Sequence, residues 1–173
     1  MPTVLVSSLS GVPQAIANYR PSHLITLLSP ENMIETPCEI DRERHLRLAL
    51  NDVAEPWGSD APAQHHIAHL IEFGRGWGAE APILIHCWAG VSRSMAAAYA
   101  LLCDRAGPGY ELEIARALRT RAPHACPNLL MVRLADDALR RDGRMVQAVT
   151  TIGRGEIIAE TGCVVLPLFL AQL

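Results

Sequence analysis

The chain has 173 residues, of which 50% are hydrophobic, 19% are charged and 5% are aromatic. That apolar fraction excludes a disordered or fibrous protein, and the length suits one domain with a substantial core. The formal net charge is −3, from 15 basic and 18 acidic residues, and no lysine is present. Because there is no excess of positive charge to hold a nucleic-acid backbone, we expect no nucleic-acid partner.

The five cysteines do not form the pattern of a disulfide framework, because their number is odd and no Cys-x-x-Cys pair occurs. The first ten residues, MPTVLVSSLS, lack the basic start and long apolar run of a signal peptide. The apolar end from Cys163 to Leu173 contains Pro167 and is too short to span a bilayer. We therefore expect a cytoplasmic protein without a membrane span.

Strand and helix signals alternate in the first part of the chain, which is typical of an α/β fold. Short runs rich in apolar and β-branched residues predict strands at Thr3–Ser8, His23–Leu28 and His45–Leu50. The third run alternates, which places Leu46, Leu48 and Leu50 on one face. A helix is predicted over Val12–Tyr19, and a polar, glutamate-rich stretch from Glu31 to Glu43 separates the second and third strands.

A loop at Asn51–Pro62 precedes a helix whose first turn holds Pro62 and which runs to about Phe73. The stripe expected to be buried consists of Ile67, Leu70, Ile71 and either Phe73 or Gly74. The continuously apolar run Ile83-Leu84-Ile85 predicts a central parallel strand that is covered on both faces.

Mainly helical signals follow, at Ser94–Ala106, Tyr110–Thr120, Asn128–Arg140 and Arg144–Ile152. No repeat or linker interrupts the chain, so we expect one domain over residues 1–173. Residues 154–173 would be an apolar tail that packs on this domain or joins an interface. The predicted fold is α/β, with a central, mostly parallel sheet flanked by helices on both faces.

The segment His86-Cys87-Trp88-Ala89-Gly90-Val91-Ser92-Arg93-Ser94 joins the central strand to the alanine-rich helix. Successive backbone N–H groups in such a loop form a nest for an anion, and the helix N-terminus adds its positive end. Arg93 adds a planar fork that can bind two phosphate oxygens. These positive groups would stabilise a thiolate at Cys87, which would face the bound phosphate for in-line attack.

This segment, HCWAGVSRS, resembles the HCxxGxxRS/T signature of the cysteine-dependent protein tyrosine phosphatases, in the short form of the dual-specificity phosphatases. The resemblance implies that Cys87 is the nucleophile and Arg93 the phosphate clamp. Ser94 would help the thiolate to leave when the intermediate is hydrolysed, and His86 would tune the cysteine. Substrate binding would involve Trp88, Ala89, Gly90, Val91, Ser92 and Arg93. The family's chemistry needs no metal and no organic cofactor.

The family also uses a general acid on a separate loop, and the stretch LALNDVAEP offers Asp52 for this role. One predicted helix and one predicted strand lie between Asp52 and Cys87, as in the dual-specificity layout. Glu55 and Asp60 occupy the same loop and are alternative acids.

The variable positions of the motif carry Trp88, Ala89 and Val91, with no additional basic residue. We therefore expect an enzyme for phosphotyrosine or a similar aryl phosphate, on a protein or a small ester, in preference to phosphoinositides. Trp88 either contacts the substrate or packs against the domain. The oligomeric state is left open.

Two alternative functions accompany this hypothesis: a rhodanese-like sulfurtransferase, and a phosphoprotein-binding pseudophosphatase. The serine after Arg93 and the candidate acid favour the phosphatase over the sulfurtransferase. The presence of Cys87 and Arg93 argues against the pseudophosphatase, although a chain without a true general acid would remain a binder. Cys87 as a purely structural thiol is a further alternative.

Other sequence features have simpler explanations. His65, His69 and Glu72 share a helix face and could bind a metal, although an exposed polar face that also includes His66 explains them as well. The GRGWG stretch precedes a strand, so it predicts a helix end and not a dinucleotide loop. Asn128 is expected to cap a helix or to support the phosphate loop, and Cys38 or Cys126 are candidates for a disulfide with oxidised Cys87.

Overall fold

The structure is a computed structural model that describes residues 3–168. Its five strands form one sheet and are β1 (Thr3–Ser7), β2 (His23–Leu28), β3 (His45–Ala49), β4 (Ile83–His86) and β5 (Val164–Pro167). Their order across the sheet is β3-β2-β4-β1-β5. The first four are parallel and β5 is antiparallel to β1, so the expected mostly parallel sheet is confirmed.

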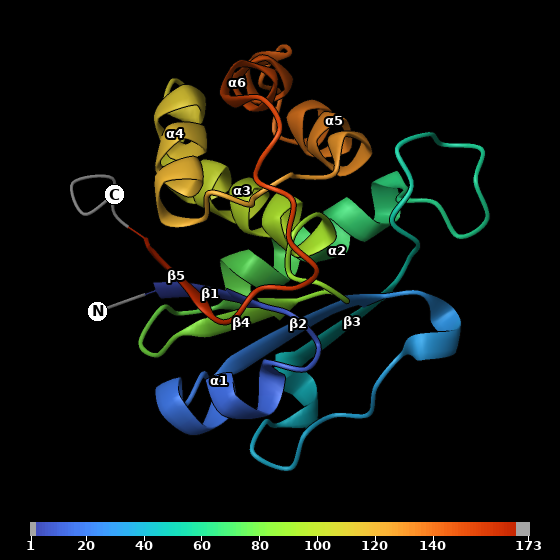
Figure 1. Cartoon of the computed structure of the whole chain (residues 1–173), viewed down its shortest axis with the longest axis vertical. Coiled ribbons are helices and arrows are strands. Elements are labelled where there is room, and N and C mark those ends of the chain that lie inside the picture. Colours follow the sequence, from blue (N-terminus) through green and yellow to red (C-terminus); the bar gives the residue numbers. More distant parts are fainter. Residues whose placement is uncertain (1–2, 169–173) are drawn as a thin grey trace.

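The helices lie on both faces of the sheet, as expected (Figure 1). They are α1 (Val12–Tyr19), α2 (Gln64–Gly76), α3 (Arg93–Ala106), α4 (Glu111–Arg121), α5 (Leu129–Ala138) and α6 (Arg144–Ile152). Helix α1 covers one face, and the other five helices lie on the opposite face. Two short 3-10 turns, η1 (Pro30–Asn32) and η2 (Arg42–Arg44), lie in the polar stretch between β2 and β3.

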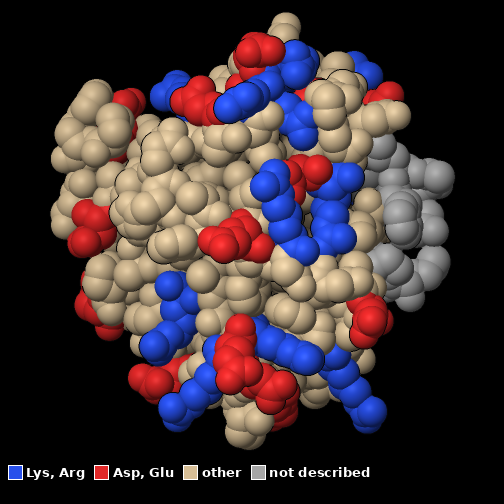
Figure 2. All heavy atoms as spheres, turned by 180° about the vertical axis from the view of Figure 1, so that it is seen from behind, with Lys and Arg blue, Asp and Glu red and all other residues tan. Residues whose placement is uncertain are grey.

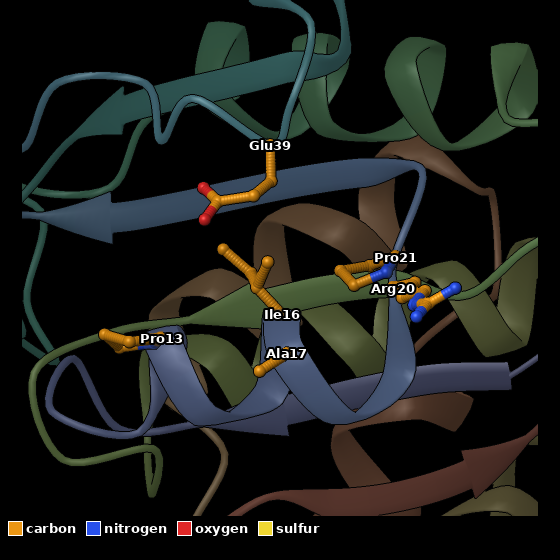
Figure 3. A pocket seen from close by; sticks show the side chains of 6 residues that line it. All are labelled: Pro13, Ile16, Ala17, Arg20, Pro21 and Glu39. Atoms are coloured by element: carbon orange, nitrogen blue, oxygen red, sulfur yellow. The ribbon is translucent and has the colours of Figure 1, made fainter.

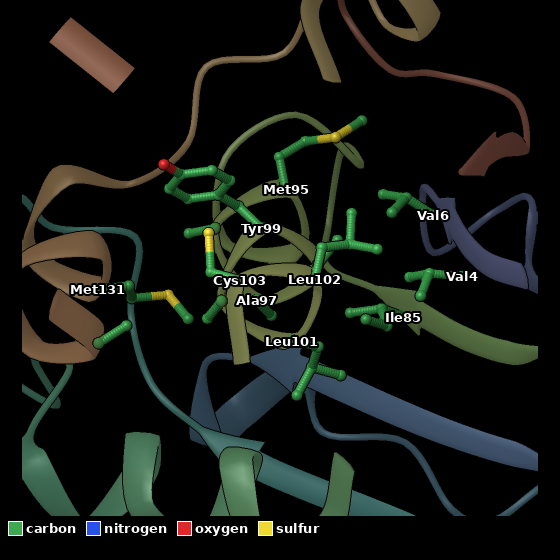
Figure 4. Close-up of a cluster of buried hydrophobic side chains, with 14 of the residues drawn as sticks. Val4, Val6, Ile85, Met95, Ala97, Tyr99, Leu101, Leu102, Cys103 and Met131 are labelled. Atoms are coloured by element: carbon green, nitrogen blue, oxygen red, sulfur yellow. The ribbon is translucent and has the colours of Figure 1, made fainter. Parts of the chain in front are cut away.

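The core on the face covered by five helices is built around α3, which is buried along most of its length (Figure 4). Alternate residues of the strands, such as Val4, Val6 and Ile85, join this core, while Leu5 and Leu84 pack with α1 on the other face. This alternation follows from the two-residue period of a strand. Burial on both faces explains the uninterrupted apolar run of β4.

The parallel arrangement brings several loops to one edge of the sheet. The carboxyl ends of β1 and β4 are in register, with Ser7 beside His86, and Thr26 of β2 flanks His86 on the other side. The loops that follow β1, β3 and β4 therefore leave from the same edge, which is where α/β sheets usually bind ligands.

Several element boundaries differ from the expectation by a few residues. Helix α2 begins at Gln64, not at Pro62, because the Ala63 N–H donates to Nδ1 of His66 and the chain turns there. The buried stripe of α2 is as expected, and Gly74 is the one of the two alternatives that completes it; a Cβ on Gly74 would collide with Leu101 of α3. Helix α5 ends at Ala138, ahead of the predicted Arg140, where buried Asp136 accepts hydrogen bonds from the first turn of α6.

The predicted tail contains a strand, because Val164–Pro167 form β5 against β1. Residues 169–173 of that tail lie outside the described residues.

At the other edge of the sheet, β3 buries Leu48 and leaves Leu46 half-buried. Between residues 3 and 168, no helix is long and apolar enough to cross a bilayer. Arginine and acidic side chains are interspersed on the rear face, as Figure 2 shows.

Candidate active site

Three neighbouring segments hold the loop at residues 87–92 and set the direction of its peptide groups. Backbone bonds run from Leu9 N to Trp88 O, from Thr161 N to Ala89 O and from Cys126 N to Val91 O, at 3.0, 2.9 and 3.0 Å. Because the N–H of a trans peptide lies opposite its carbonyl, the N–H groups of residues 89, 90 and 92 point away from these neighbours. The loop is thereby shaped as a nest for an anion.

Cys87 lies at the base of this nest and is 2% exposed. Its Sγ accepts a hydrogen bond from the Gly90 N–H at 3.3 Å and lies 3.1 Å from the Ser94 hydroxyl. Helix α3 begins at Arg93, so the positive end of its dipole adjoins the sulfur. The thiol is thus surrounded by groups that favour negative charge at this point.

Arg93 is a buried cation whose hydrogen-bonding capacity is only partly used. Its Nη1 donates to the Leu50 carbonyl at 3.0 Å, and this bond fixes the guanidinium between the loop and the end of β3. Its Nε has no hydrogen-bond acceptor among the described residues and lies 3.9 Å from Oδ2 of Asp52. An oxyanion in the nest could use these free donors.

Asp52 lies at the edge of the nest. Its Oδ1 accepts from the Ser92 hydroxyl at 2.7 Å and from Nδ2 of Asn128 at 2.8 Å. Among the described contacts of the alternative acids, Asp60 accepts from Ser59 and none reaches the loop, while Glu55 is exposed. The structure therefore brings Asp52, and not its two neighbours, to Arg93.

Asn128 performs both of the roles that the sequence allowed. Its side-chain oxygen accepts from the Met131 N–H and so caps α5, and its amide donates to Asp52 and to the Val53 carbonyl. The Asn128 N–H also donates to the Ser92 carbonyl at 3.3 Å. One residue thus links α5, the phosphate loop and the Asp52 loop.

A buried chain of hydrogen bonds ends at His86, next to Cys87. Of its members, only His86 was predicted from the sequence. It connects Thr36 Oγ1, His45 Nδ1, His45 Nε2, Thr26 Oγ1 and His86 Nε2, with links of 2.9, 2.8 and 2.7 Å. Thr26 and His45 lie on adjacent strands, and no local pattern marks such a pairing before the strand order is known.

Burial lowers the pKa of both His86 and His45 to about 4, so both imidazoles are neutral at physiological pH. His86 Nδ1 faces the Cys87 carbonyl at 3.4 Å, which can only accept, so this nitrogen carries the proton. Nε2 of His86 then accepts from the Thr26 hydroxyl, and Thr26 accepts from Nε2 of His45. Nδ1 of His45 in turn accepts from Thr36. Each donor in this chain has one acceptor.

Trp88 does not pack against the domain, because 57% of its side chain is exposed at the rim of the nest. The histidines of α2 do not gather into a metal site: within residues 3–168 no group of three His, Cys, Asp or Glu side chains could hold a metal ion. His65 instead stacks on His66, with ring centroids 3.9 Å apart.

All five cysteines are free, and four of them lie outside the nest. Burial raises the pKa of Cys103 to about 12 and that of Cys163 to about 11. Cys38 donates to Glu39, which raises the pKa of Cys38 as well.

A groove of about 400 Å³ between α1 and Glu39 contains no residue of the phosphate loop (Figure 3).

No protein-family model matches the sequence, and no curated protein sequence is detectably similar to it. Solved structures do match. DUSP15 superposes with a TM-score of 0.62 at 20% identity, covering 88% of this chain and 91% of its own. PTPMT1, solved in complex with PI(5)P, gives 0.62 at 16% identity, with 86% and 96% covered.

A third similar structure is the human tyrosine phosphatase-like serine/threonine/tyrosine-interacting protein, with a TM-score of 0.60 at 20% identity and coverage of 80% and 91%. The chain spans most of each of these three structures. The comparison agrees with the expectation from HCWAGVSRS at the level of the fold. The protein has the fold of the dual-specificity-like protein tyrosine phosphatases.

Proposed function

We propose that this protein is a phosphatase that hydrolyses phosphate monoesters, of phosphotyrosine or a similar aryl group, through a cysteinyl-phosphate intermediate. The observation that carries the proposal is the nest itself. Cys87 Sγ lies at its base beside the Gly90 N–H, and the buried Arg93 guanidinium has an unused donor at its edge. The fold shared with DUSP15 and PTPMT1 supports the same class of activity.

In the first step, the Cys87 thiolate attacks phosphorus while the nest N–H groups and Arg93 hold the phosphoryl oxygens. An S–P bond forms and the P–O bond to the leaving group breaks. Asp52 gives its proton to the departing oxygen. Because Arg93 Nε faces Asp52 at 3.9 Å, a bound phosphate would take over the guanidinium and release the carboxyl group to face the leaving group.

In the second step, water attacks the phosphocysteine and Asp52 accepts its proton. The S–P bond breaks, inorganic phosphate leaves and the thiolate is restored. The Ser94 hydroxyl, 3.1 Å from Sγ, donates to the sulfur as negative charge returns to it. The neutral His86 holds the Cys87 carbonyl and so orients the start of the loop.

The exposed Trp88 at the rim supports an aryl ester as substrate, since an aromatic ring stacks well on indole. The loop itself offers no basic side chain besides Arg93 for further phosphate groups. We therefore expect a higher kcat/KM for phosphotyrosine than for multiply phosphorylated inositol lipids.

The test combines turnover with oxyanion binding. Cys87→Ser should lower turnover of an aryl phosphate by roughly 10³-fold or more and still bind vanadate, because the nest survives. Arg93→Ala should lose both. A chelator should have no effect. Turnover by the Cys87→Ser protein at a rate near that of the wild type would contradict the mechanism.

Two results would point to the alternative functions. Vanadate binding without any turnover by the wild type would indicate a phosphoprotein-binding pseudophosphatase. Transfer of sulfur from thiosulfate to cyanide would indicate the sulfurtransferase.

A second test uses thiol reactivity. Near neutral pH the raised pKa values of Cys38, Cys103 and Cys163 keep these thiols protonated. Iodoacetate should therefore modify Cys87 ahead of these three thiols, and inorganic phosphate should protect Cys87 by filling the nest. Peptide mapping by mass spectrometry identifies the labelled residue.

A further inference from the structure

Exposed apolar side chains gather on the segments that border the phosphate loop. The large apolar residues exposed among the described part of the chain are Tyr19, Trp57, Trp88, Tyr110, Leu129, Ile157 and Ile158. Trp88 belongs to the loop, Trp57 follows Asp52 in the same connection, and Leu129 follows Asn128. Ile157 and Ile158 precede Thr161, which bonds to Ala89. Single exposed apolar residues are ordinary, but a group around one site indicates a recognition surface.

An apolar groove of about 350 Å³ lies between the segment at residues 126–129 and the end of α6. Its walls include Cys126, Pro127, Leu129, Val149 and Arg154. Cys126 is also the residue whose N–H donates to the Val91 carbonyl at 3.0 Å, so one wall of the groove is bonded directly to the outer side of the phosphate loop. A volume of this size accommodates a large aliphatic or aromatic side chain.

The charges on the same segments are mainly negative. The acidic residues outnumber the basic ones on the segments at residues 51–63, 87–93, 122–129 and 153–161. The acidic residues are Asp52, Glu55, Asp60, Glu156 and Glu160, and the basic residues are Arg93 and Arg154. Glu160 is held at the rim, where its Oε2 accepts from the Ser10 hydroxyl at 2.8 Å. Apart from Arg93 in the nest and Arg154 in the groove wall, the charges of these segments are acidic, and they repel an acidic peptide or an anionic membrane surface and attract a neutral or basic partner.

We propose that the groove is a specificity subsite for a phosphopeptide, and that it takes an apolar side chain next to the phosphorylated residue in a neutral or basic sequence. This inference rests on the proposed phosphatase function. The phosphate enters the nest, the neighbouring apolar side chain enters the groove against Leu129, and the acidic rim favours basic residues farther along. A phosphorylated lipid in a bilayer is the competing class, and the acidic rim disfavours it.

The experiment measures kcat/KM of the full chain for phenyl phosphate and for phosphotyrosine peptides that differ at one neighbouring position, Ala or Leu. Parallel peptides replace distant residues by Arg or Glu, and vesicles of anionic lipid carry a phosphomonoester lipid. We expect the Leu peptide to exceed the Ala peptide by about tenfold, as for a side chain bound in an apolar pocket. Arg-containing peptides should exceed their Glu counterparts.

Leu129→Glu should remove the preference for Leu over Ala, and Glu160→Arg should reduce the preference for Arg over Glu. Tyr110→Glu changes an exposed aromatic residue at the start of α4 and should leave every kcat/KM as in the wild type. Equal rates for the Leu and Ala peptides, a preference that survives Leu129→Glu, or faster turnover of the vesicle lipid than of any peptide would overturn the inference.

Binding keeps the two proposals separable. Calorimetric Kd values of the same peptides for the Cys87→Ser protein test the subsite without turnover. Preferential binding of the Leu peptide together with an inactive wild type would overturn the phosphatase proposal alone. Turnover of phenyl phosphate together with equal Kd values would overturn the subsite alone.

Discussion

Gly90 occupies a position in the phosphate loop where a residue with a Cβ does not fit. Its φ is +75°, and a Cβ would lie 2.7 Å from the Ser7 carbonyl carbon, 2.8 Å from the Ser8 nitrogen and in collision with Thr161. The loop can therefore approach the end of β1 closely, and its carbonyls reach the N–H groups of Leu9 and Thr161. Those bonds turn the opposite N–H groups toward Cys87.

Gly90→Ala should consequently damage both stability and activity. The positive φ and the close backbone contacts together should cost about 2–4 kcal/mol of unfolding free energy, and turnover should fall because the nest opens. Gly143→Ala is the matched control, since Gly143 also has a positive φ of 83° but no atom within 4 Å of its would-be Cβ. Urea unfolding and aryl phosphate turnover measure the two effects, and equal losses in both variants would contradict the role of close packing at Gly90.

Asp52 is the residue whose assignment depends most on geometry. The sequence offered three carboxylates in one loop, and only Asp52 is bound to both Ser92 and Asn128. Its side chain is 39% exposed, so a leaving group at the mouth can reach it. The choice among the three required the positions of α5 and the loop after β3, which are far apart in sequence.

Asp52→Asn should slow hydrolysis of phosphotyrosine by roughly 10²–10⁴-fold, because the basic tyrosyl oxygen needs a proton as it leaves. Hydrolysis of nitrophenyl phosphate should slow less, since nitrophenolate is a better leaving group. The alkaline limb of the pH profile of kcat should also disappear. The control variants Glu55→Gln and Asp60→Asn should behave as the wild type. If one of them shows this pattern instead, the residue that it replaces is the general acid.

At the scale of elements, three adjacent parallel strands support the start of the phosphate loop. The hydrogen-bond chain runs from His45 on β3 through Thr26 on β2 to His86 on β4. Thr26 donates to one imidazole and accepts from the other, so its hydroxyl links both rings. The order β3-β2-β4, and not any local motif, creates this arrangement.

Thr26→Val keeps the shape of the side chain and removes the link. Two buried imidazole nitrogens then lose their partner, which should cost about 2–6 kcal/mol of stability, at about 1–3 kcal/mol for each group. Turnover should also fall, and nitrogen NMR should show that His86 no longer holds a single tautomer. Thr36→Val removes only the donor to Nδ1 of His45, which water can replace, so its loss of stability should be smaller. A loss of stability as large as that of Thr26→Val would contradict the role of this hydrogen-bond chain.

Much of the element order could be predicted, since α1, β2 and α6 have the predicted bounds. Their signals are local: a regular apolar period and a breaker such as Pro21. The ends of α2 and α5 were misplaced because His66 and Asp136 bind the backbone at those points. Side-chain caps of this kind depend on tertiary contacts that a periodic pattern does not contain.

At the scale of the whole molecule, the local motif around Cys87 was predictable and the nonlocal surroundings were not. The apolar segment at Val164–Pro167 had no signal that identified β1 as its partner. The same holds for Thr26 beneath the loop and for Thr161 against Gly90, which are distant in sequence. Such pairings depend on strand order and crossover connections, which one sequence specifies only weakly.

The stability of the whole molecule should depend on pH through the two buried histidines. Burial lowers the folded-state pKa of His86 and His45 to about 4, whereas both titrate near 6.5 in the unfolded chain. Between pH 6.5 and 4 the unfolded state thus binds more protons than the folded state. Their contribution to stability is fully present above pH 6.5 and is lost as the pH falls toward 4.

We expect the urea midpoint to fall over this interval, with His86 and His45 each contributing on the order of 1–3 kcal/mol. His45→Gln should flatten the decline relative to the wild type, because one proton fewer is taken up on unfolding. His69→Gln, at an exposed position of α2, should leave it unchanged. Each variant lacks only one histidine, so comparison of the three slopes isolates the contribution of that histidine. A decline that His69→Gln flattens as much as His45→Gln would show that burial of His45 and His86 is not its cause.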